Sequence, residues 1–547
     1  MAILNRILLL FLYATLVFST AICLGQAGGD SNQGGLGPGQ QAESRQHTIS
    51  GQVVNSVTGQ PIARALVQFG GQHATLTDHE GRYEFDNVIE DSGTALVTKP
   101  GYFPQDNEGL SQGRSITLQL IPEAIVFGTI TDETGQPIQD LTVQLKMLQV
   151  SQGLRHWQPQ QSTTTNAEGE FRFAELQAGK YSLTTGFKIE GLPEAASSVA
   201  FLPVAYPPLG GDGVNGALTV APGDHIEANI LPKVGKLYRV TGQVNGRFAM
   251  GVGFEFETMD GESVSPSIRF YPTGAFRMML PSGSYRFKAH SNVGREQFLG
   301  TGEITVGEAP LDGVAINLGP QITLPVEVEY QAVSTDTQRA SSGASSLNLL
   351  LQDDDPAGQM RTFPAQPPQP SARNLTDPNG PLVIQNIEPG HYALQAQTQP
   401  PWYLASASCG NVDLTRDPLV LSAGSSACVL RVVLRDDCAS LKYSVTASDA
   451  NSSASHVFVF AIPLGNRAQP VTTNSFSSQT ITANSPFEGS FECLAPGRYL
   501  LLALQHQQEV PYRDAEALQR YTSLGQEVTV ARSGKSEVQL QLAAGEP

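Results

Sequence analysis

Two stretches of the 547-residue chain contain the same pentapeptide, TGQPI, at Thr58–Ile62 and again at Thr134–Ile138. Each copy is preceded by a short alternating apolar run and followed by another, Ala65–Phe69 after the first and Leu141–Leu145 after the second. Glycine supplies the positive φ of a tight turn and proline stiffens its exit, so each copy predicts a strand, a turn and a second strand. An identical pentapeptide at matching places indicates a duplicated β unit.

A second pattern recurs five times along the chain. A turn glycine is followed by alternating aromatic or apolar residues, and in four copies a Gly-x-Tyr element comes next. The turn glycines are Gly81, Gly169, Gly274, Gly380 and Gly489, and the Gly-x-Tyr elements begin at Gly179, Gly283, Gly390 and Gly497. We therefore expect five similar sandwiches, with Phe and Tyr entering each core at alternate positions.

The repeats predict an all-β chain, a tandem array of about five β-sandwich domains. Alternating strands close the domains, and Tyr512–Tyr521 is the best short helix, because amphipathic helical patterning is nearly absent elsewhere. Three loops, 149–165, 331–373 and 400–415, are predicted to make the contacts with a ligand. The predicted domains are 47–121, 122–235, 236–319, 320–435 with long loops, and 436–547.

The N-terminus indicates export. Residues 1–27 contain one early positive charge, the apolar run Ile7–Phe18 and small residues before Ala27, which predicts a signal peptide cleaved after Ala27. An uncleaved anchor and lipidation at Cys23 are the alternatives. Residues 28–46 are rich in Gly, Gln and Ser and predict a disordered linker. No later apolar run reaches the roughly 18 residues of a membrane span, so no transmembrane segment is expected after cleavage.

Four cysteines follow the signal segment, all in the last quarter of the chain. An even number in an exported chain predicts disulfides, for which three connectivities are possible. The local pairs Cys409–Cys428 and Cys438–Cys493 are favoured because each lies within one predicted domain. A zinc site is the competing interpretation, which the absence of CxxC spacing and of neighbouring His disfavours.

The composition excludes some classes of partner. The formal net charge is −18, with only 15% charged residues against roughly 25% in ordinary domains. Nucleic acid and anionic membranes select clusters of Lys and Arg, so neither is an expected partner. The 54 Gly and 36 Pro lack a collagen period, and in a many-stranded chain they are turn residues.

No motif predicts catalysis, a cofactor or a resident metal. His506–Glu509 matches the short half of a carboxypeptidase zinc motif, but no His follows it, so a ligand is missing. Gly534–Ser536 resembles the end of a phosphate loop but lacks the upstream glycine, so it is interpreted as a turn. Asp353–Asp355 could bind Ca²⁺, although such a run is more often a solvated loop. Asp78 is expected to cap its own turn.

Trp157 and Trp402 are the only tryptophans, and both lie beside predicted loops. An exposed aromatic ring can stack on a sugar, so both residues are candidates for ligand stacking. The alternative, to which we give more weight, is that each ring covers the end of its own sandwich.

The TGQPI element and the TD-x-x-G-x-Y-x-F turn closely resemble the carboxypeptidase regulatory-like domain. The matching positions are Gly51, Thr58–Ile62, Asp78, Gly81, Tyr83 and Phe85 in the first copy, and Gly128, Thr134–Ile138, Gly169, Phe171 and Phe173 in the second. The resemblance implies a seven-stranded Ig-like or prealbumin-like β-sandwich, grouped with starch-binding-like folds, and a module that carries no catalytic residues. The first copy departs from it where Gly93–Ala95 replaces Gly-x-Tyr, and copies three to five match more loosely.

These observations predict an exported, non-catalytic binding, adhesion or cell-envelope structural protein, located in the periplasm, at the cell surface or outside the cell. It is expected to be monomeric, with a protein or polysaccharide of the cell envelope as its partner. One alternative is a carbohydrate-binding protein that uses Trp157 or Trp402, an analogy that rests on fold alone. A remote alternative is an accessory of a separate hydrolase.

Overall fold

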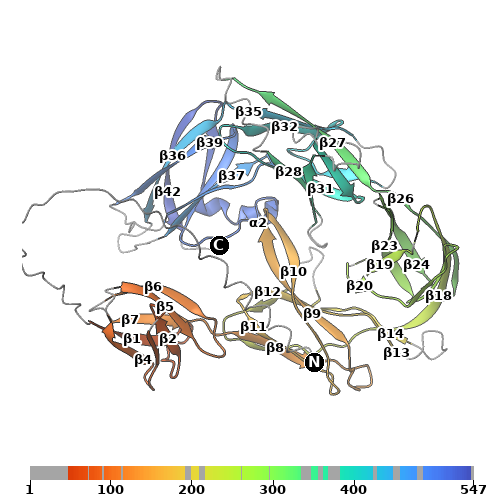
Figure 1. Ribbon diagram of the computed structural model, residues 1–547, viewed down its shortest axis with the longest axis horizontal. Coiled ribbons are helices and arrows are strands. Elements are labelled where there is room, and N and C mark those ends of the chain that lie inside the picture. The colour runs from red at the N-terminus through yellow and green to blue at the C-terminus, as the bar shows by residue number, and fades with distance from the viewer. Residues whose placement is uncertain are drawn as a thin grey trace, which may run out of the picture.

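The computed structural model describes residues 47–71, 73–88, 92–111, 115–190, 199–208, 216–249, 251–259, 261–294, 296–333, 347–354, 361–367, 382–422, 428–447, 456–476 and 485–543. The predicted signal peptide and linker, residues 1–46, lie outside this part, as does most of the predicted loop 331–373. The described chain is almost entirely β, and its strands form five successive units (Figure 1).

The first unit is a sandwich of seven strands, the number that the family resemblance implies. Its two sheets have the orders β4-β1-β7 and β3-β2-β5-β6. The strands are β1 (His47–Asn55), β2 (Leu66–Phe69), β3 (His73–Leu76), β4 (Arg82–Val88), β5 (Ser92–Thr98), β6 (Gln105–Ser111) and β7 (Ile116–Leu120).

The second unit repeats this plan with a much longer first hairpin. Its sheets have the orders β11-β8-β17 and β10-β9-β12-β15, with β16 beside β12. The strands are β8 (Ala124–Thr129), β9 (Thr142–Ser151), β10 (Leu154–Thr164), β11 (Glu170–Leu176), β12 (Gly179–Thr185), β15 (Ala205–Tyr206), β16 (Leu218–Val220) and β17 (His225–Glu227).

The third unit is joined to the second through a sheet. The strands β13 (Lys188–Glu190) and β14 (Val199–Phe201) leave the second unit and extend the sheet that contains β18 (Val234–Asn245). The other strands are β19 (Gly253–Thr258), β20 (Ser263–Val264), β21 (Ile268–Phe270), β22 (Ala275–Pro281), β23 (Gly283–Val293), β24 (Glu296–Val306), β25 (Leu311–Asn317) and β26 (Gly319–Pro320).

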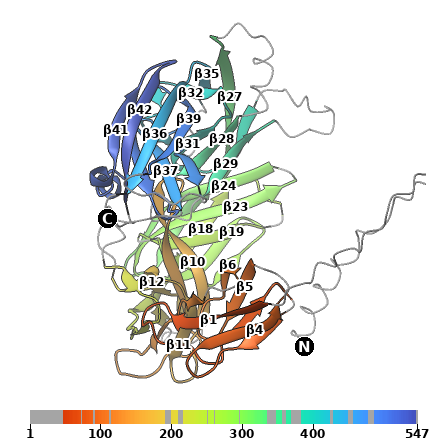
Figure 2. The same cartoon turned by 90° about the vertical axis from the view of Figure 1, so that its left-hand side faces the viewer.

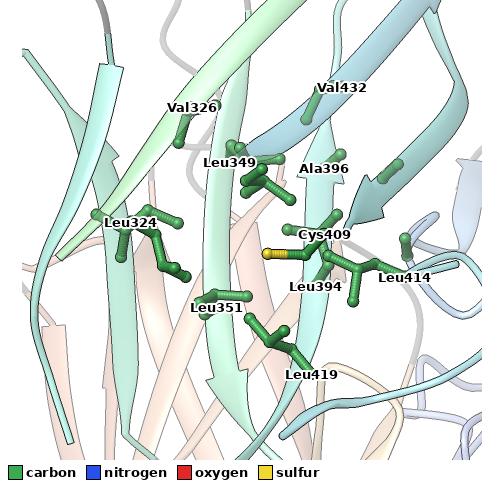
Figure 3. Close-up of a cluster of buried hydrophobic side chains, with 14 of the residues drawn as sticks. Leu324, Val326, Leu349, Leu351, Leu394, Ala396, Cys409, Leu414, Leu419 and Val432 are labelled. Atoms are coloured by element: carbon green, nitrogen blue, oxygen red, sulfur yellow. The ribbon is translucent and has the colours of Figure 1, made fainter. Parts of the chain in front are cut away.

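The fourth unit is a single nine-stranded path, β33-β32-β35-β27-β30-β29-β28-β31-β34. Its strands are β27 (Ile322–Gln331), β28 (Asn348–Asp353), β29 (Thr362–Gln366), β30 (Leu382–Ile387), β31 (Gly390–Gln397), β32 (Tyr403–Cys409), β33 (Val412–Asp413), β34 (Leu419–Leu421) and β35 (Leu430–Arg435). Figure 3 shows its core, in which Leu324, Leu351 and Leu394 converge beside Cys409.

The fifth unit contains the one α-helix of the described chain, inside the predicted helical stretch. Its elements are β36 (Ala439–Ala447), β37 (Val457–Leu464), β38 (Thr472–Phe476), β39 (Phe487–Leu494), β40 (Gly497–Leu504), α2 (Ala515–Gln519), the 3-10 turn η1 (Thr522–Leu524), β41 (Gln526–Val530) and β42 (Lys535–Ala543). Asp514 caps α2, since its side chain accepts a hydrogen bond from the amide of Ala517.

One strand arrangement recurs in all five units. The first strand of each unit pairs antiparallel with a strand from the middle of the unit and parallel with the strand that closes it, which in the third unit is followed by the short β26. The antiparallel partner directly follows the turn glycine in the first three units. Gly380 lies outside the described residues, and Gly489 lies inside β39, so the predicted turn at Gly489 is wrong. The antiparallel pairs are β1–β4, β8–β11, β18–β22, β27–β30 and β36–β39, and the parallel pairs are β1–β7, β8–β17, β18–β25, β27–β35 and β36–β42. The looser third, fourth and fifth copies therefore share the topology of the first two.

The Gly-x-Tyr element has the same structural role in its four copies. Each tyrosine is at most 2% exposed, and its hydroxyl donates to the carbonyl four residues earlier, from Tyr181 to Gln177, Tyr285 to Pro281, Tyr392 to Glu388 and Tyr499 to Ala495, over 2.8–3.0 Å. Burial favours the neutral phenol and raises the pKa of Tyr285 to about 12. The element thus fills the core and holds its own turn.

The buried clusters follow the units, in the ranges 49–120, 124–230, 240–318, 322–434 and 439–542, with a second cluster on the other face of the fifth unit. Some contacts cross between units. Ala468 of the fifth unit packs in the fourth core, and β14, which precedes the predicted boundary at 235, pairs with β18 of the third unit. The boundaries at 121, 235, 319 and 435 stay predictions.

The structure pairs the cysteines as favoured from the sequence, Cys409 with Cys428 and Cys438 with Cys493. The first disulfide joins β32 to the start of β35 inside the fourth unit, and the second joins the entry of β36 to β39 inside the fifth. Each removes conformational freedom from the unfolded chain.

Two of the three predicted contact loops are largely strands, which corrects the sequence interpretation. Residues 149–165 contain the end of β9, the turn and all of β10, and residues 400–415 contain β32 and β33. Within 331–373, the described parts include β28 and β29. Gln149 and Gln158 are polar, yet they pair in the ladder with His156 and Met147, because the hairpin hydrogen bonds come from the backbone and not from the side chains.

Candidate functional site

A polar cleft of about 340 Å³ lies between the second and third units. One wall is the outer face of the β9–β10 hairpin, and the opposite wall is built from the loop at Gly261 and the start of β23. The lining residues include Thr142, Gln144, Lys146, Trp157, Pro159, Ser162, Thr184, Thr185, Glu257, Glu262, Ser263, Ser265 and Arg286. The cleft is larger than a second polar hollow, of about 230 Å³, between the third and fourth units.

Strand alternation explains why these hairpin residues share one face. Side chains at i and i+2 of a strand point to the same side, which places Gln144 with Lys146 on β9. Directly paired residues across a ladder also share a face, and Lys146 lies opposite Pro159 while Leu148 lies opposite Trp157. The other face of β9 carries Val143 and Leu145, which are buried in the core of the second unit.

An ion pair bridges the two walls of the cleft. The Lys146 Nζ lies 3.0 Å from each carboxylate oxygen of Glu262, and both side chains are 17% exposed. Glu262 sits in a tight turn in which its carbonyl accepts from the Thr258 amide, with Gly261 at a φ of 82°. The pair orients the third unit against the hairpin and keeps both charges compensated.

Arg286 contributes a donor to the same wall. Its Nη2 donates to the carbonyl of Met259 over 2.6 Å, while its Nε is buried and has no hydrogen-bond partner among the described residues. A buried unpaired donor costs free energy, of the order of 1–3 kcal/mol, unless an acceptor reaches it. With Lys146, Glu257 and Glu262, Arg286 makes the formal charge of the cleft zero, so the site favours a neutral polar ligand over a strongly charged one.

The two tryptophans differ in their surroundings. Trp157 is half-buried on β10 and lines the cleft. Trp402 is only 3% exposed, packs in the fourth core and lies edge-on to Tyr330, with ring centroids 5.2 Å apart. This burial leaves Trp402 packed within its own unit, in line with the interpretation that was given more weight, and removes it as a candidate for stacking on a ligand.

Sequence reasoning found Trp157 but missed Lys146, Glu262 and Arg286. No local signal could have identified them, because they come from two units and none belongs to a motif. Strand alternation could have placed Lys146 on the outer face of its strand. Its partner Glu262 lies 116 residues away and is visible only in the folded chain.

A smaller hollow of about 230 Å³ lies at the junction of the third and fourth units. It is lined by polar residues such as Glu255, His290 and Asn292 and by Phe298. Across this junction Lys288 pairs with Glu388 at 3.0 Å, and Glu388 also pairs with Arg361. These pairs tie the two units together, so we interpret this hollow as part of an interface.

The aspartate run considered for Ca²⁺ is engaged by arginines. Asp353 is buried and lies 2.7 Å from Arg361 Nη2, and Asp354 lies 3.3 Å from Arg467 Nη2. Burial raises the pKa of Asp354, and the neighbouring arginines act in the opposite direction. Asp355 lies outside the described residues. Within the described chain no group of three or more His, Cys, Asp or Glu is placed to hold a metal ion.

Two other sequence interpretations can be located. Asp78 accepts hydrogen bonds from the Arg82 amide through its side chain, over 2.8 Å, and from the Gly81 amide through its carbonyl, which confirms the predicted turn cap. His506 and Glu509 are both exposed in the segment after β40. Neither described helix has the length and apolar character that crossing a membrane requires.

Comparison with protein families finds matches in the first two units. Residues 48–120 and 125–200 each match the family model of the carboxypeptidase regulatory-like domain. The first matched segment has nearly the same bounds as the first unit. The second matched segment runs from β8 into β14. No curated protein matches the sequence significantly.

Comparison with solved structures finds matches at low sequence identity, several of which are pilins. The Streptococcal ancillary pilin is 12% identical, with 51% of this chain and 100% of that chain covered and a TM-score of 0.19. BcpA, the major pilin subunit of Bacillus cereus, is 13% identical, with 57% and 99% covered and a TM-score of 0.15. The Bacillus anthracis TIE protein is 13% identical, with a TM-score of 0.16, and the match spans 51% of its chain and 50% of this one. At these TM-scores the similarities carry no inference about what this chain binds.

Proposed function

From the two tandem carboxypeptidase regulatory-like domains that this chain contains, at residues 48–120 and 125–200, we propose that it is an exported, non-catalytic binding or adhesion protein of the cell envelope. The observation that carries the proposal is the cleft of about 340 Å³ between the second and third units. A preformed hollow with an aromatic ring and several polar groups is the usual form of a binding site.

Two disulfides support export. Cys409–Cys428 and Cys438–Cys493 each lie inside one unit, where they constrain the unfolded chain. Disulfides form and persist in oxidising compartments such as the periplasm and the cell exterior.

A saccharide is the second, more specific candidate for the ligand. Trp157 offers an aromatic surface, and around it the cleft presents hydroxyls from Thr142 and Ser162, the amide of Gln144 and balanced charges. A sugar has apolar C–H faces that can stack on an aromatic ring and hydroxyls that need hydrogen-bond partners. An uncharged envelope polysaccharide fits this chemistry better than an anionic polymer.

Binding of the full exported chain to an array of neutral and acidic glycans, and to isolated cell-envelope material, tests the proposal. We expect Trp157→Ala to weaken binding at least tenfold, because it removes the aromatic surface of the cleft. Trp402→Phe is the matched control: it changes the other tryptophan, which is buried in the fourth core, and should leave the affinity unchanged.

Three results would contradict parts of the proposal. Equal affinity of wild type and Trp157→Ala would remove the cleft as the site of contact. Binding to envelope protein with no binding to any glycan would overturn the saccharide candidate alone. Turnover of peptide or oligosaccharide substrates by the purified chain would overturn the non-catalytic assignment.

A further inference from the structure

The tip of the β9–β10 hairpin contacts the fifth unit, far from its own sandwich. The hairpin ladder runs without interruption at its outer end to the pair Ser151 and Leu154, and Gln152 and Gly153 make the two-residue turn at φ values of 53° and 80°. In Figure 1 the hairpin rises from the second unit and ends beside α2. The contact joins residues about 360 positions apart in the sequence.

The backbone of the tip fits closely against the segment before α2. Gly153 is buried, and a Cβ added there would collide with the ring of Tyr512. The carbonyl of Gly153 accepts a hydrogen bond from the amide of Arg513 over 3.0 Å. Only glycine allows this approach, because the position combines a positive φ with contact against an aromatic ring.

A charge-assisted pair adds to this contact. The Arg155 guanidinium donates through Nε over 2.9 Å, and also through Nη2, to Oδ2 of Asp514. The other oxygen of Asp514 caps α2. The two side chains are 23% and 24% exposed, so the pair is partly shielded from solvent. Asp514 therefore fixes the start of the helix and the hairpin at the same time.

Arg513 anchors the segment 512–514, on which the hairpin tip docks. It is 7% exposed, and its Nη2 donates to the carbonyl of Arg467 over 2.6 Å and to that of Leu394 over 3.3 Å. Through Leu394 the segment is bonded to the fourth unit, and through Arg467 to the fifth. The tip thus docks onto a surface that the last two units hold together.

We infer that the β9–β10 hairpin is a clasp, in which residues 151–155 dock on residues 512–514. The clasp closes the second to fifth units into a ring. It also holds in place the wall of the cleft that carries Trp157. Successive units are joined by the β14–β18 pairing, the Lys288–Glu388 pair and the Tyr403–Asp437 hydrogen bond of 2.8 Å. These junctions keep the tip near its receptor, so docking costs little chain entropy.

The clasp and the cleft share one strand face. Arg155 and Trp157 are two residues apart on β10 and therefore point to the same side. A docked tip restrains the hairpin at its outer end, while Lys146–Glu262 restrains it at the middle. Release of the tip should leave the Trp157 wall free to move. This link between the clasp and the cleft rests on the proposed function of the cleft.

Gly153→Asn tests the clasp in the full exported chain. Asparagine is the residue after glycine that best tolerates a positive φ, so the turn survives while its side chain collides with Tyr512. Gly70→Asn is the matched control, at the tip of the short β2–β3 hairpin, where φ is 58° and no atom lies within 4 Å of the added Cβ. Asp514→Asn is a second test, because Asn still caps α2 but removes the charge.

The readouts are the radius of gyration from X-ray scattering, the mass from light scattering and hydrogen exchange of residues 512–519. We expect Gly153→Asn to increase the radius of gyration and to speed hydrogen exchange of residues 512–519 at least tenfold. Asp514→Asn should change both quantities in the same direction but less. Gly70→Asn should match wild type in both. No difference between Gly153→Asn and Gly70→Asn would overturn the clasp. A wild-type dimer that dissociates on Gly153→Asn would show docking between copies and overturn the closed ring.

Trp157 fluorescence tests the link to the cleft without any ligand. In a Trp402→Phe background Trp157 is the sole tryptophan, and we expect its emission to shift to longer wavelength in Gly153→Asn and not in Gly70→Asn. An enlarged particle with unchanged emission would overturn the link between clasp and cleft. Failure of every glycan and of envelope material to bind would overturn only the proposed function, because none of these readouts uses a ligand.

Discussion

The first and second units start from the same sequence repeat, yet their first hairpins differ. In the first unit β2 and β3 have four residues each, and the turn between them contains Gly70 and Gly71. In the second unit β9 has 10 residues and β10 has 11, and the hairpin leaves the sandwich (Figure 2). The cleft wall and the clasp both lie on this extension. A change of hairpin length thus adds contacts to a module whose core is unchanged.

The shared core is built from equivalent residues. In each unit a buried threonine hydroxyl accepts a hydrogen bond from one amide and donates one to a carbonyl. The Thr77 hydroxyl accepts from the Ala65 amide and donates to the Ile62 carbonyl. The Thr165 hydroxyl accepts from the Leu141 amide and donates to the Ile138 carbonyl. The turn glycines Gly81 and Gly169 have φ values of 72° and 73°. The core of the duplicated module therefore tolerates extension of the hairpin without adjustment.

The largest expected effect tests whether the two cores are equivalent. At Gly51 and Gly128 an added Cβ would collide with a backbone carbonyl of the neighbouring strand or segment, of Ile116 and of Ala228. We expect Gly51→Val and Gly128→Val each to destabilise its own unit by about 3 kcal/mol or more, because backbone must shift. Hydrogen exchange of the buried amides of each unit measures the loss.

Gly59→Ala and Gly135→Ala are the controls for these substitutions. Both glycines have positive φ but open space around them, so the loss should be about 1–2 kcal/mol, from the backbone alone. A large loss at Gly51 with none at Gly128 would show that the extended hairpin had changed the core.

An intermediate effect is expected at the paired threonines. Thr77→Val and Thr165→Val each leave a buried amide and carbonyl without partners, and should lower the free energy of unfolding by about 1–3 kcal/mol. Serine at either position keeps the hydroxyl and should lose less. Unequal losses at the two sites, measured by the same exchange experiment, would count against equivalent cores.

The smallest effect is a difference between the two TGQPI turns at low pH. In the first turn the Asn55 side chain accepts from the amides of Val57 and Thr58, and in the second Asp132 accepts from those of Thr134 and Gln136. The hydroxyl of Thr134, followed by the Gln136 amide, holds the pKa of Asp132 below its usual value. Because the folded pKa is lowered, the stabilisation exists at neutral pH and is lost as pH falls through it.

Acid should therefore loosen the second turn and leave the first unchanged. Hydrogen exchange of residues 131–138 and 54–62, corrected for intrinsic rates between pH 7 and pH 2, measures this. Asp132→Asn should remove the pH dependence and make the two turns behave alike. Equal loosening of both turns in acid would show that another group is responsible.

Several elements could be predicted because their information is local. Glycines at positive φ, alternating apolar residues and Gly-x-Tyr identify turns and strands within about ten residues, and four buried tyrosines have the same hydrogen bond. The two disulfides also followed from proximity in sequence. The β9–β10 extension was missed because its polar faces carry no period-2 contrast.

The sequence by itself determined the all-β class, the duplication and the five repeats, and it favoured the cysteine pairing that the structure has, because each depends on neighbours within a unit. Only the tertiary structure decided that Trp157 faces a cleft while Trp402 is buried, that Lys146 meets Glu262, and that Gly153 docks beside Tyr512. The physical reason is that these contacts join different units. Their partners are selected by how the sandwiches pack, and strand periodicity carries no information about that packing.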